Sequence, residues 1–173
     1  MIIDDYRALI ESLAGGRPVI IAFDNGPRPQ KPYAVVYLNL ARPTGAHVGK
    51  FDEDGARYVE SHRPGRLQIH CYGDQSEGFD MADTISLRLM TDAAIEAAAA
   101  LNIAWMGQPT LESIPALMDN GDYEDRAILT VETAYTGSIF ENVGFFDKVQ
   151  IEASTEPAAS GPSVIDITVD LSP

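Results

Sequence analysis

The sequence is poor in the residue types that most often carry chemistry. Its 173 residues include one cysteine and three histidines. The single cysteine, Cys71, rules out an internal disulfide framework and suits a reducing compartment. His47, His62 and His70 are scattered along the chain. We therefore expect no disulfide scaffold, and we expect Cys71 to be a small buried apolar side chain.

Long apolar runs and basic residues are also scarce. No window approaches the roughly 20 apolar residues of a membrane span, and the acidic N-terminus does not resemble a signal peptide. The net charge of −14 argues against a surface that grips nucleic acid. Residues 1–66 hold nine of the twelve basic residues but only eight of the 26 acidic ones, so the acidic excess lies in residues 67–173. This excess indicates either a solvated surface or one that meets copies of itself or faces DNA without binding it.

Sequence motifs for catalysis and ligand binding are missing as well. Gly15-Gly16-Arg17 does not make a phosphate-binding loop or a dinucleotide fingerprint. His70 and Cys71 are neighbours on an expected strand, so they point to opposite faces and cannot act as a pair. The acidic loops 52–54 and 119–125 lack the ligand ladder of an EF-hand, which leaves a loose cation site as the alternative to a solvated turn. We expect no catalytic residue and no cofactor.

What the sequence does contain is a regular succession of helical and strand patterns. Helices are expected at residues 3–14 and 76–101, the second with a break at Thr91-Asp92 and an apolar stripe of Phe79, Ala82, Ile85, Leu89, Ala93 and Ala97. Residues 66–72 alternate strictly, with Leu67, Ile69 and Cys71 on one face. Other strands are expected at residues 19–23, 33–41, 126–135, 148–154 and 164–171, while residues 42–66 are expected to form a long polar loop and 102–126 a mixed segment.

This order predicts an α+β fold class, because strands cluster in adjacent antiparallel-type pairs with few βαβ crossovers. We expect one mainly antiparallel sheet with helices packed on one face, a long hairpin-like loop and a C-terminal strand extension. The domain would span residues 1–156, and residues 157–173 would be a linker followed by the extension. The final strand either closes the protein's own sheet or adds to the sheet edge of a neighbour.

The strand at residues 33–41 is apolar on both faces and follows a proline-rich segment. Residues 24–32, called the proline arm below, hold three prolines. Because proline fixes φ and pushes the preceding residue towards extended conformations, the arm is expected to be stiff. It delivers a strand whose two faces are covered either by the chain's own helices or by a neighbouring subunit. The arm therefore indicates positioning rather than catalysis.

Three sequence segments carry a resemblance to a known family. Residues 25–34 read Asn-Gly-Pro-Arg-Pro-Gln-Lys-Pro-Tyr-Ala and lead into the strand, residues 65–73 form a strand that ends in glycine before a helix, and residues 124–127 (Glu-Asp-Arg-Ala) open the next strand. In these segments, and in element order over residues 3–153, the chain resembles the phage neck terminator (tail terminator) proteins of tailed bacteriophages. The first segment is the specific one, and the tail after Glu156 departs from the family pattern.

The resemblance implies a structural virion protein at the head-to-tail junction, without enzymatic activity or cofactor. It implies a homohexameric ring, assembled in the host cytoplasm, that caps the tail tube protein and joins it to head-completion or connector proteins. DNA would pass through without specific binding, and no membrane is implied. We expect the subunit interface near the arm and its strand, at Pro27, Arg28, Pro29, Pro32, Tyr33 and Tyr37. We expect the acidic loop of Asp52, Glu53 and Asp54 to face the lumen or the docking surface.

Three alternatives remain open at the level of the sequence. One is another virion ring subunit, in head completion or in the baseplate. Another is a small acidic metal-dependent hydrolase, which would need a tight site of several carboxylates. The third is a monomeric adaptor that binds a partner's sheet edge through the final strand at residues 164–171.

Overall fold

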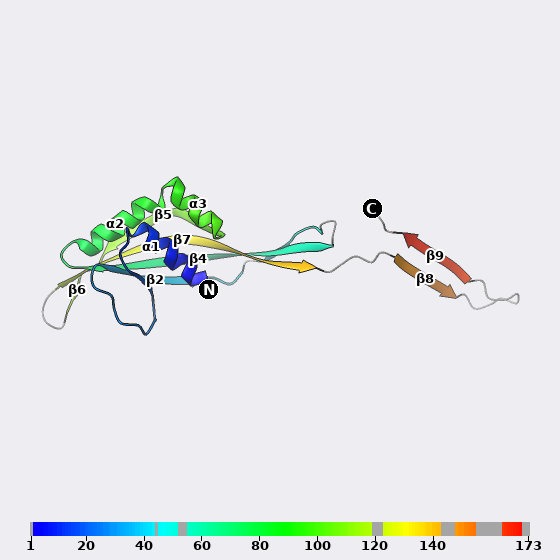
Figure 1. The fold of residues 1–173 in the computed structure, drawn as a ribbon, viewed down its shortest axis with the longest axis horizontal. Helices are drawn as coiled ribbons and strands as arrows, with labels where there is room; N and C mark the ends of the chain where they lie inside the picture. Colours follow the sequence, from blue (N-terminus) through cyan, green and yellow to red (C-terminus); the bar gives the residue numbers. More distant parts are fainter. Residues whose placement is uncertain are drawn as a thin grey trace. The chain divides into compact units, whose positions relative to one another are not determined.

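The computed structural model describes residues 2–43, 45–51, 55–118, 123–142, 148–154 and 164–170 (Figure 1). It contains three helices and a curled sheet, as well as a separate strand pair. The elements in chain order are α1 (Ile2–Leu13), β1 (Val19–Ile21), β2 (Tyr33–Leu40), β3 (Ala46–Val48), β4 (Ala56–Gly73), α2 (Glu77–Leu89), α3 (Asp92–Ala100), β5 (Ile103–Ser113), β6 (Ala116–Leu117), β7 (Tyr123–Asn142), β8 (Lys148–Ser154) and β9 (Val164–Asp170).

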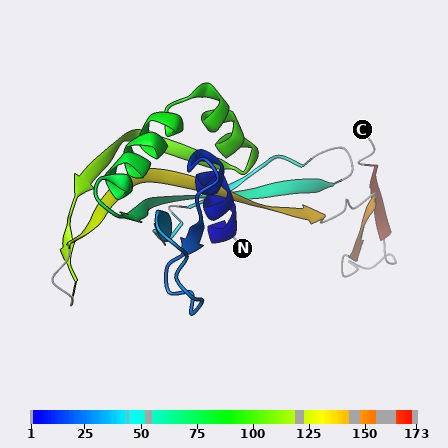
Figure 2. The same cartoon turned by 60° about the vertical axis from the view of Figure 1, so that its left-hand side comes forward.

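The main sheet has seven strands and is mostly antiparallel. Its central order is β1-β2-β4-β7-β5, with β3 paired to β4 and β6 paired to β7. β1 runs parallel to β2, whereas β2 is antiparallel to β4 and β5 is antiparallel to β7. The helices lie on one side of this sheet in both views (Figure 2). The predicted α+β fold class is confirmed.

The core lies between the helices and one face of the sheet. Leu67, Ile69 and Cys71 are fully buried on that face, as the alternation of residues 66–72 predicts. Burial raises the pKa of the Cys71 thiol to about 12, so the thiol stays protonated and behaves as an apolar group. The helices bury a matching set of side chains against it: Tyr6, Leu9, Ile10, Met81, Ala82, Ile85 and Leu89.

One buried polar contact crosses this core. The hydroxyl of Thr133 on β7 donates to the backbone carbonyl of Ala104 on β5 at 2.9 Å. Its oxygen lies 2.8 Å from the Tyr6 hydroxyl on α1. Since the single Thr133 proton is engaged with Ala104, Tyr6 is the donor. The contact joins α1 to the two strands beneath it and satisfies every hydroxyl involved.

The segment expected to be a hairpin-like loop contains β3 paired with the first part of β4, which begins at Ala56. The segment expected to be mixed contains β5 at residues 103–113. Both stretches escape a periodicity test because they mix polar with apolar residues, and because the first part of β4 is mostly half-buried and β5 is mostly exposed. Gly65 lets β4 lie close to the end of β2, since a Cβ there would lie 2.8 Å from the backbone oxygen of Asn39.

The described residues divide into two compact units. The first unit is residues Met1–His47 with Glu60–Ser138, and the second is Val48–Val59 with Ile139–Pro173. In the second unit β8 and β9 form their own antiparallel two-stranded sheet, with Ile151 opposite Ile167. The final strand thus pairs with β8, a partner that the sequence did not identify. None of the described helices is long and apolar enough to cross a membrane.

Candidate functional site

The proline arm is anchored to the domain by Lys31. Its Nζ lies 2.7 Å from Glu124 Oε1 at the start of β7 and 3.1 Å from Asp74 Oδ1 just after β4. The Glu124 carboxylate is nearly buried, with the residue 6% exposed. The hydrogen bond to Glu124 raises the pKa of Lys31, so the ammonium stays charged. The arm is therefore held at its C-terminal end, just before the cis peptide bond between Lys31 and Pro32.

A stack of three side chains continues the anchorage across the sheet. Tyr33, the first residue of β2, is buried and its ring lies parallel to that of Tyr72 on β4, with centroids 5.0 Å apart. The guanidinium of Arg126 on β7 lies 5.4 Å from the centre of the Tyr72 ring, within the range of a cation–π contact. The stack joins the arm's strand to β4 and β7 on the face away from the helices.

The next carboxylate in the β7 segment fixes α2. Asp125 Oδ2 accepts a hydrogen bond from the backbone N–H of Phe79 at 2.9 Å, which caps the helix from a distant strand. Gly78 permits this approach, because a Cβ there would lie 2.8 Å from the Asp125 carbonyl oxygen. Ser76, the residue that precedes α2, makes no capping hydrogen bond with its side chain. Glu124, Asp125 and Arg126 thus hold the arm, the helix and the aromatic stack.

Arg126 also contacts His70 on β4. Its Nη2 lies 2.7 Å from His70 Nδ1. Arginine has only donors, so it donates and the histidine nitrogen accepts without a proton. Burial, followed by the charge of Arg126, lowers the pKa of His70 and keeps the ring neutral. The Nε of Arg126 is buried, and among the described residues it has no hydrogen-bond partner.

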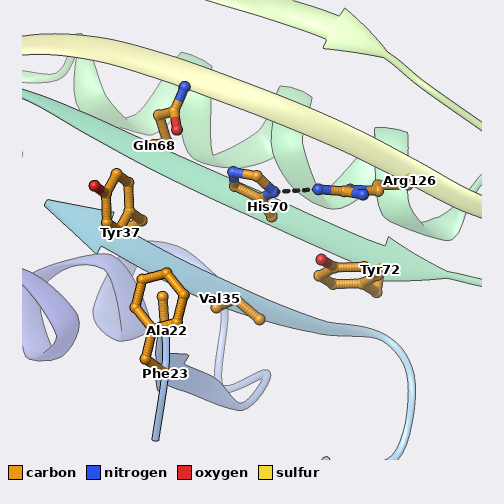
Figure 3. Close-up of a pocket in the computed structure, with 8 residues that line it drawn as sticks. All are labelled: Ala22, Phe23, Val35, Tyr37, Gln68, His70, Tyr72 and Arg126. Carbon is orange, nitrogen blue, oxygen red and sulfur yellow. Dashed lines mark hydrogen bonds between the residues drawn. The ribbon is translucent and has the colours of Figure 1, made fainter.

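An open pocket of about 350 Å³ lies on the sheet face opposite the helices (Figure 3). Phe23 stands at its edge with φ of 65°, a left-handed conformation that is unusual for an aromatic residue, and with 89% of its surface exposed. Its ring meets that of Tyr37 edge to face at a centroid distance of 5.8 Å. The pocket is lined by Ala22, Phe23, Val35, Tyr37, Gln68, His70, Tyr72 and Arg126.

The predicted interface residues lie in and beside this region. Pro27 and Arg28 are exposed in the arm, and Pro29 and Pro32 are half-buried. Tyr37 lines the pocket, whereas Tyr33 is already buried in the aromatic stack. The second face of β2, expected to be covered, is thus partly open around Tyr37. The acidic loop of Asp52, Glu53 and Asp54 lies outside the described residues.

Sequence reasoning missed the partners of the arm. Lys31, Asp74 and Glu124 come from distant segments, and no local pattern pairs them. The tetrapeptide at residues 124–127 was the available signal, and three of its side chains make long-range contacts while the fourth, Ala127, is fully buried in the core. Among the described residues, no group of three His, Cys, Asp or Glu side chains is placed to hold a metal ion.

These contacts fix geometry within the chain and leave a partly aromatic sheet face open, and exposed apolar surface of this kind is common where proteins meet partners or ligands. The family model for the phage neck terminator protein matches residues 3–157, and the chain belongs to that family. The family gives it a structural role in the virion neck, where it assembles with other neck and tail components, and such proteins are typically non-enzymatic. Comparison with curated protein sequences finds no match.

Proposed function

We propose that the chain forms a homohexameric ring that caps the tail tube and joins it to the head connector. The observation that carries this proposal is the anchored proline arm beside an open sheet face. Lys31 and the Tyr33–Tyr72 stack hold the arm and β2 in one orientation relative to the domain. A subunit contact built on a rigid element costs less ordering on assembly than one built on a loose loop.

The interface in this proposal includes the exposed side of the arm and the open side of β2. Pro27 and Arg28 supply the exposed contacts of the arm, and Tyr37 supplies an aromatic surface. Tyr33 acts by orienting the arm, since its ring is used within the chain. Asp52, Glu53 and Asp54 would face the lumen, where negative charge repels DNA phosphates and lets the duplex slide through.

Light scattering and negative-stain imaging of the purified protein, alone and mixed with tail tubes, test the ring. We expect six-subunit particles with a central hole, located at one end of each tube. A protein that stays monomeric in both conditions would contradict the proposal. A ring with a different number of subunits would correct the stoichiometry while leaving the capping role in place.

A further inference from the structure

We propose that the open pocket receives the outer face of α2 and α3 from a second copy of the chain. This inference rests on the proposed ring and names the contact that builds it. The pocket and the outer helix face belong to the same compact unit, on opposite sides of its sheet. A contact between two different surfaces of identical subunits is head-to-tail, and such contacts form a ring when the rotation between neighbours closes and an open filament when it does not.

The pocket side offers apolar surface and one uncompensated cation. Phe23 is held out into solvent at the third position of the turn from Ile21 to Asp24, where its positive φ belongs to the turn, and its ring makes an edge contact with Tyr37. The neighbouring Arg126 has a neutral histidine as its hydrogen-bond partner, and no described carboxylate pairs with it. A cation beside aromatic rings and without a described carboxylate partner fits an occupant that brings a carboxylate together with an apolar side chain.

The outer helix face offers those two features. The charged residues of α2 and α3 are Glu77, Asp80, Asp83, Asp92 and Glu96, with Arg88 as the one basic residue in the two helices. Arg88 is exposed but its guanidinium is engaged with α1, because its Nη1 donates to the Leu13 carbonyl at 2.8 Å. Leu87, Met90 and Ile95 are exposed among these acids, and Leu87 is 67% exposed. Asp83 and Leu87 are one helical turn apart and therefore share a side of α2.

The alternative contact, pocket against pocket, is disfavoured by charge. A two-fold arrangement would bring the Arg126 side chains of two copies towards each other across an aromatic surface. Neither would find a carboxylate there, and desolvating two like charges is costly. Docking of the acidic helix face avoids this cost, because its carboxylates would lie opposite the Arg126 cation.

Engineered cysteines test the direction of the contact. The native Cys71 is fully buried and does not react, so new thiols report alone. In the double variant Phe23→Cys/Leu87→Cys, each copy carries one new thiol at its pocket and another on its outer helix face. A short bismaleimide should therefore link successive copies and give a ladder of dimers, trimers and larger species on a denaturing gel. Each single variant should give only background. The matched control Phe23→Cys/Leu117→Cys uses a residue of similar exposure, 64%, on β6 and should also give background.

The variant Phe23→Asn gives an independent measurement. Asparagine accepts the left-handed backbone, so unfolding by urea should be unchanged or require more denaturant. We expect self-association to weaken by about tenfold or more, as for the loss of a central aromatic contact, while Leu117→Asn associates like the wild type.

The outcomes separate this inference from the ring. A ladder from the double cysteine variant, together with weakened self-association of Phe23→Asn, supports the proposed contact. Dimers from Phe23→Cys alone, without a ladder from the double variant, overturn it in favour of two pocket faces meeting. If Phe23→Asn forms rings as well as the wild type does, and the double cysteine variant gives no ladder, the proposed contact is wrong and the ring remains. A wild-type protein that is monomeric with and without tail tubes refutes the ring and this contact together.

Discussion

At the residue scale, the Tyr6–Thr133 contact shows that the contribution of a buried hydroxyl to stability depends on the hydrogen-bond partners that remain when it is removed. Replacing Thr133 by valine leaves the Tyr6 hydroxyl buried without an acceptor, which should lower the free energy of unfolding by about 1–3 kcal/mol. Replacing Tyr6 by phenylalanine leaves Thr133 still bonded to Ala104, so we expect a smaller loss of about 1 kcal/mol. Urea unfolding of the two variants measures both values. Equal losses would contradict the assigned donor order.

His70 predicts a pH dependence of stability. Its folded pKa lies below the ordinary value because of burial and Arg126, so the unfolded chain binds the proton more readily. Stability should be complete above the unfolded pKa of about 6.5 and should fall as the pH drops below it, by at most about 1.4 kcal/mol per pH unit. The loss ends once the pH is below the folded pKa.

The variant His70→Gln isolates this effect, since glutamine offers an uncharged acceptor to Arg126. Urea unfolding at pH 7.5, 6.5 and 5.5 should show the wild type losing stability relative to the variant as the pH falls. His47 and His62 are present in both proteins, so their titration cancels in the difference. An identical pH profile for the two would remove His70 as the cause.

At the element scale, the anchorage of the proline arm depends on an ion pair with one nearly buried partner. Lys31→Met leaves the Glu124 carboxylate without its cation, and we expect a loss of about 1–3 kcal/mol in the free energy of unfolding. Arg66→Met breaks a pair whose side chains are 60% and 53% exposed, so we expect less than about 1 kcal/mol. Hydrogen exchange should also quicken in the arm of Lys31→Met alone. Equal losses would mean that Lys31 does not anchor the arm.

The elements that the sequence predicts well are those that bury one regular face. The spacing in residues 3–14 becomes α1, the alternation of residues 66–72 becomes the buried end of β4, and the break before Asp92 separates α2 from α3. The expected stripe is wrong in phase at its ends, where Phe79 is exposed and Ala94 and Ala98 are buried in place of their neighbours. The break between α2 and α3 resets the helical register and accounts for Ala94 and Ala98, because a continuous 3.6-residue count cannot follow it.

The site was less predictable than the fold. The proline arm is recognisable because its backbone constraint is local to the sequence. Its anchors are not, because Lys31 meets Glu124 and Asp74 only after β2, β4 and β7 have been brought together. The exposed Phe23 carries no pattern at all, since its left-handed conformation appears only in the folded chain. Long-range ion pairs and single residues with a left-handed backbone are therefore visible only in the folded structure.

At the scale of the whole molecule, the charge of −14 bears on how the proposed ring treats DNA. Binding of duplex DNA depends on basic side chains that release counterions from phosphates. A lumen lined by Asp52, Glu53 and Asp54 should therefore show no measurable affinity for duplex DNA even at low salt. Replacing these three acids by lysine creates a local basic cluster where the DNA would pass.

We expect the triple variant to bind a fluorescent DNA duplex in anisotropy titrations, with an affinity that falls steeply as salt rises, because up to about three phosphates would be neutralised per subunit. A matched control reverses three scattered acids, Asp5, Glu11 and Glu112, and changes the net charge by the same amount. The control should bind far more weakly, since nonspecific DNA affinity follows clustered charge rather than the total. If the two variants bind equally, the loop at residues 52–54 does not face the passing DNA. If neither binds although both form rings, the lumen is set by other residues.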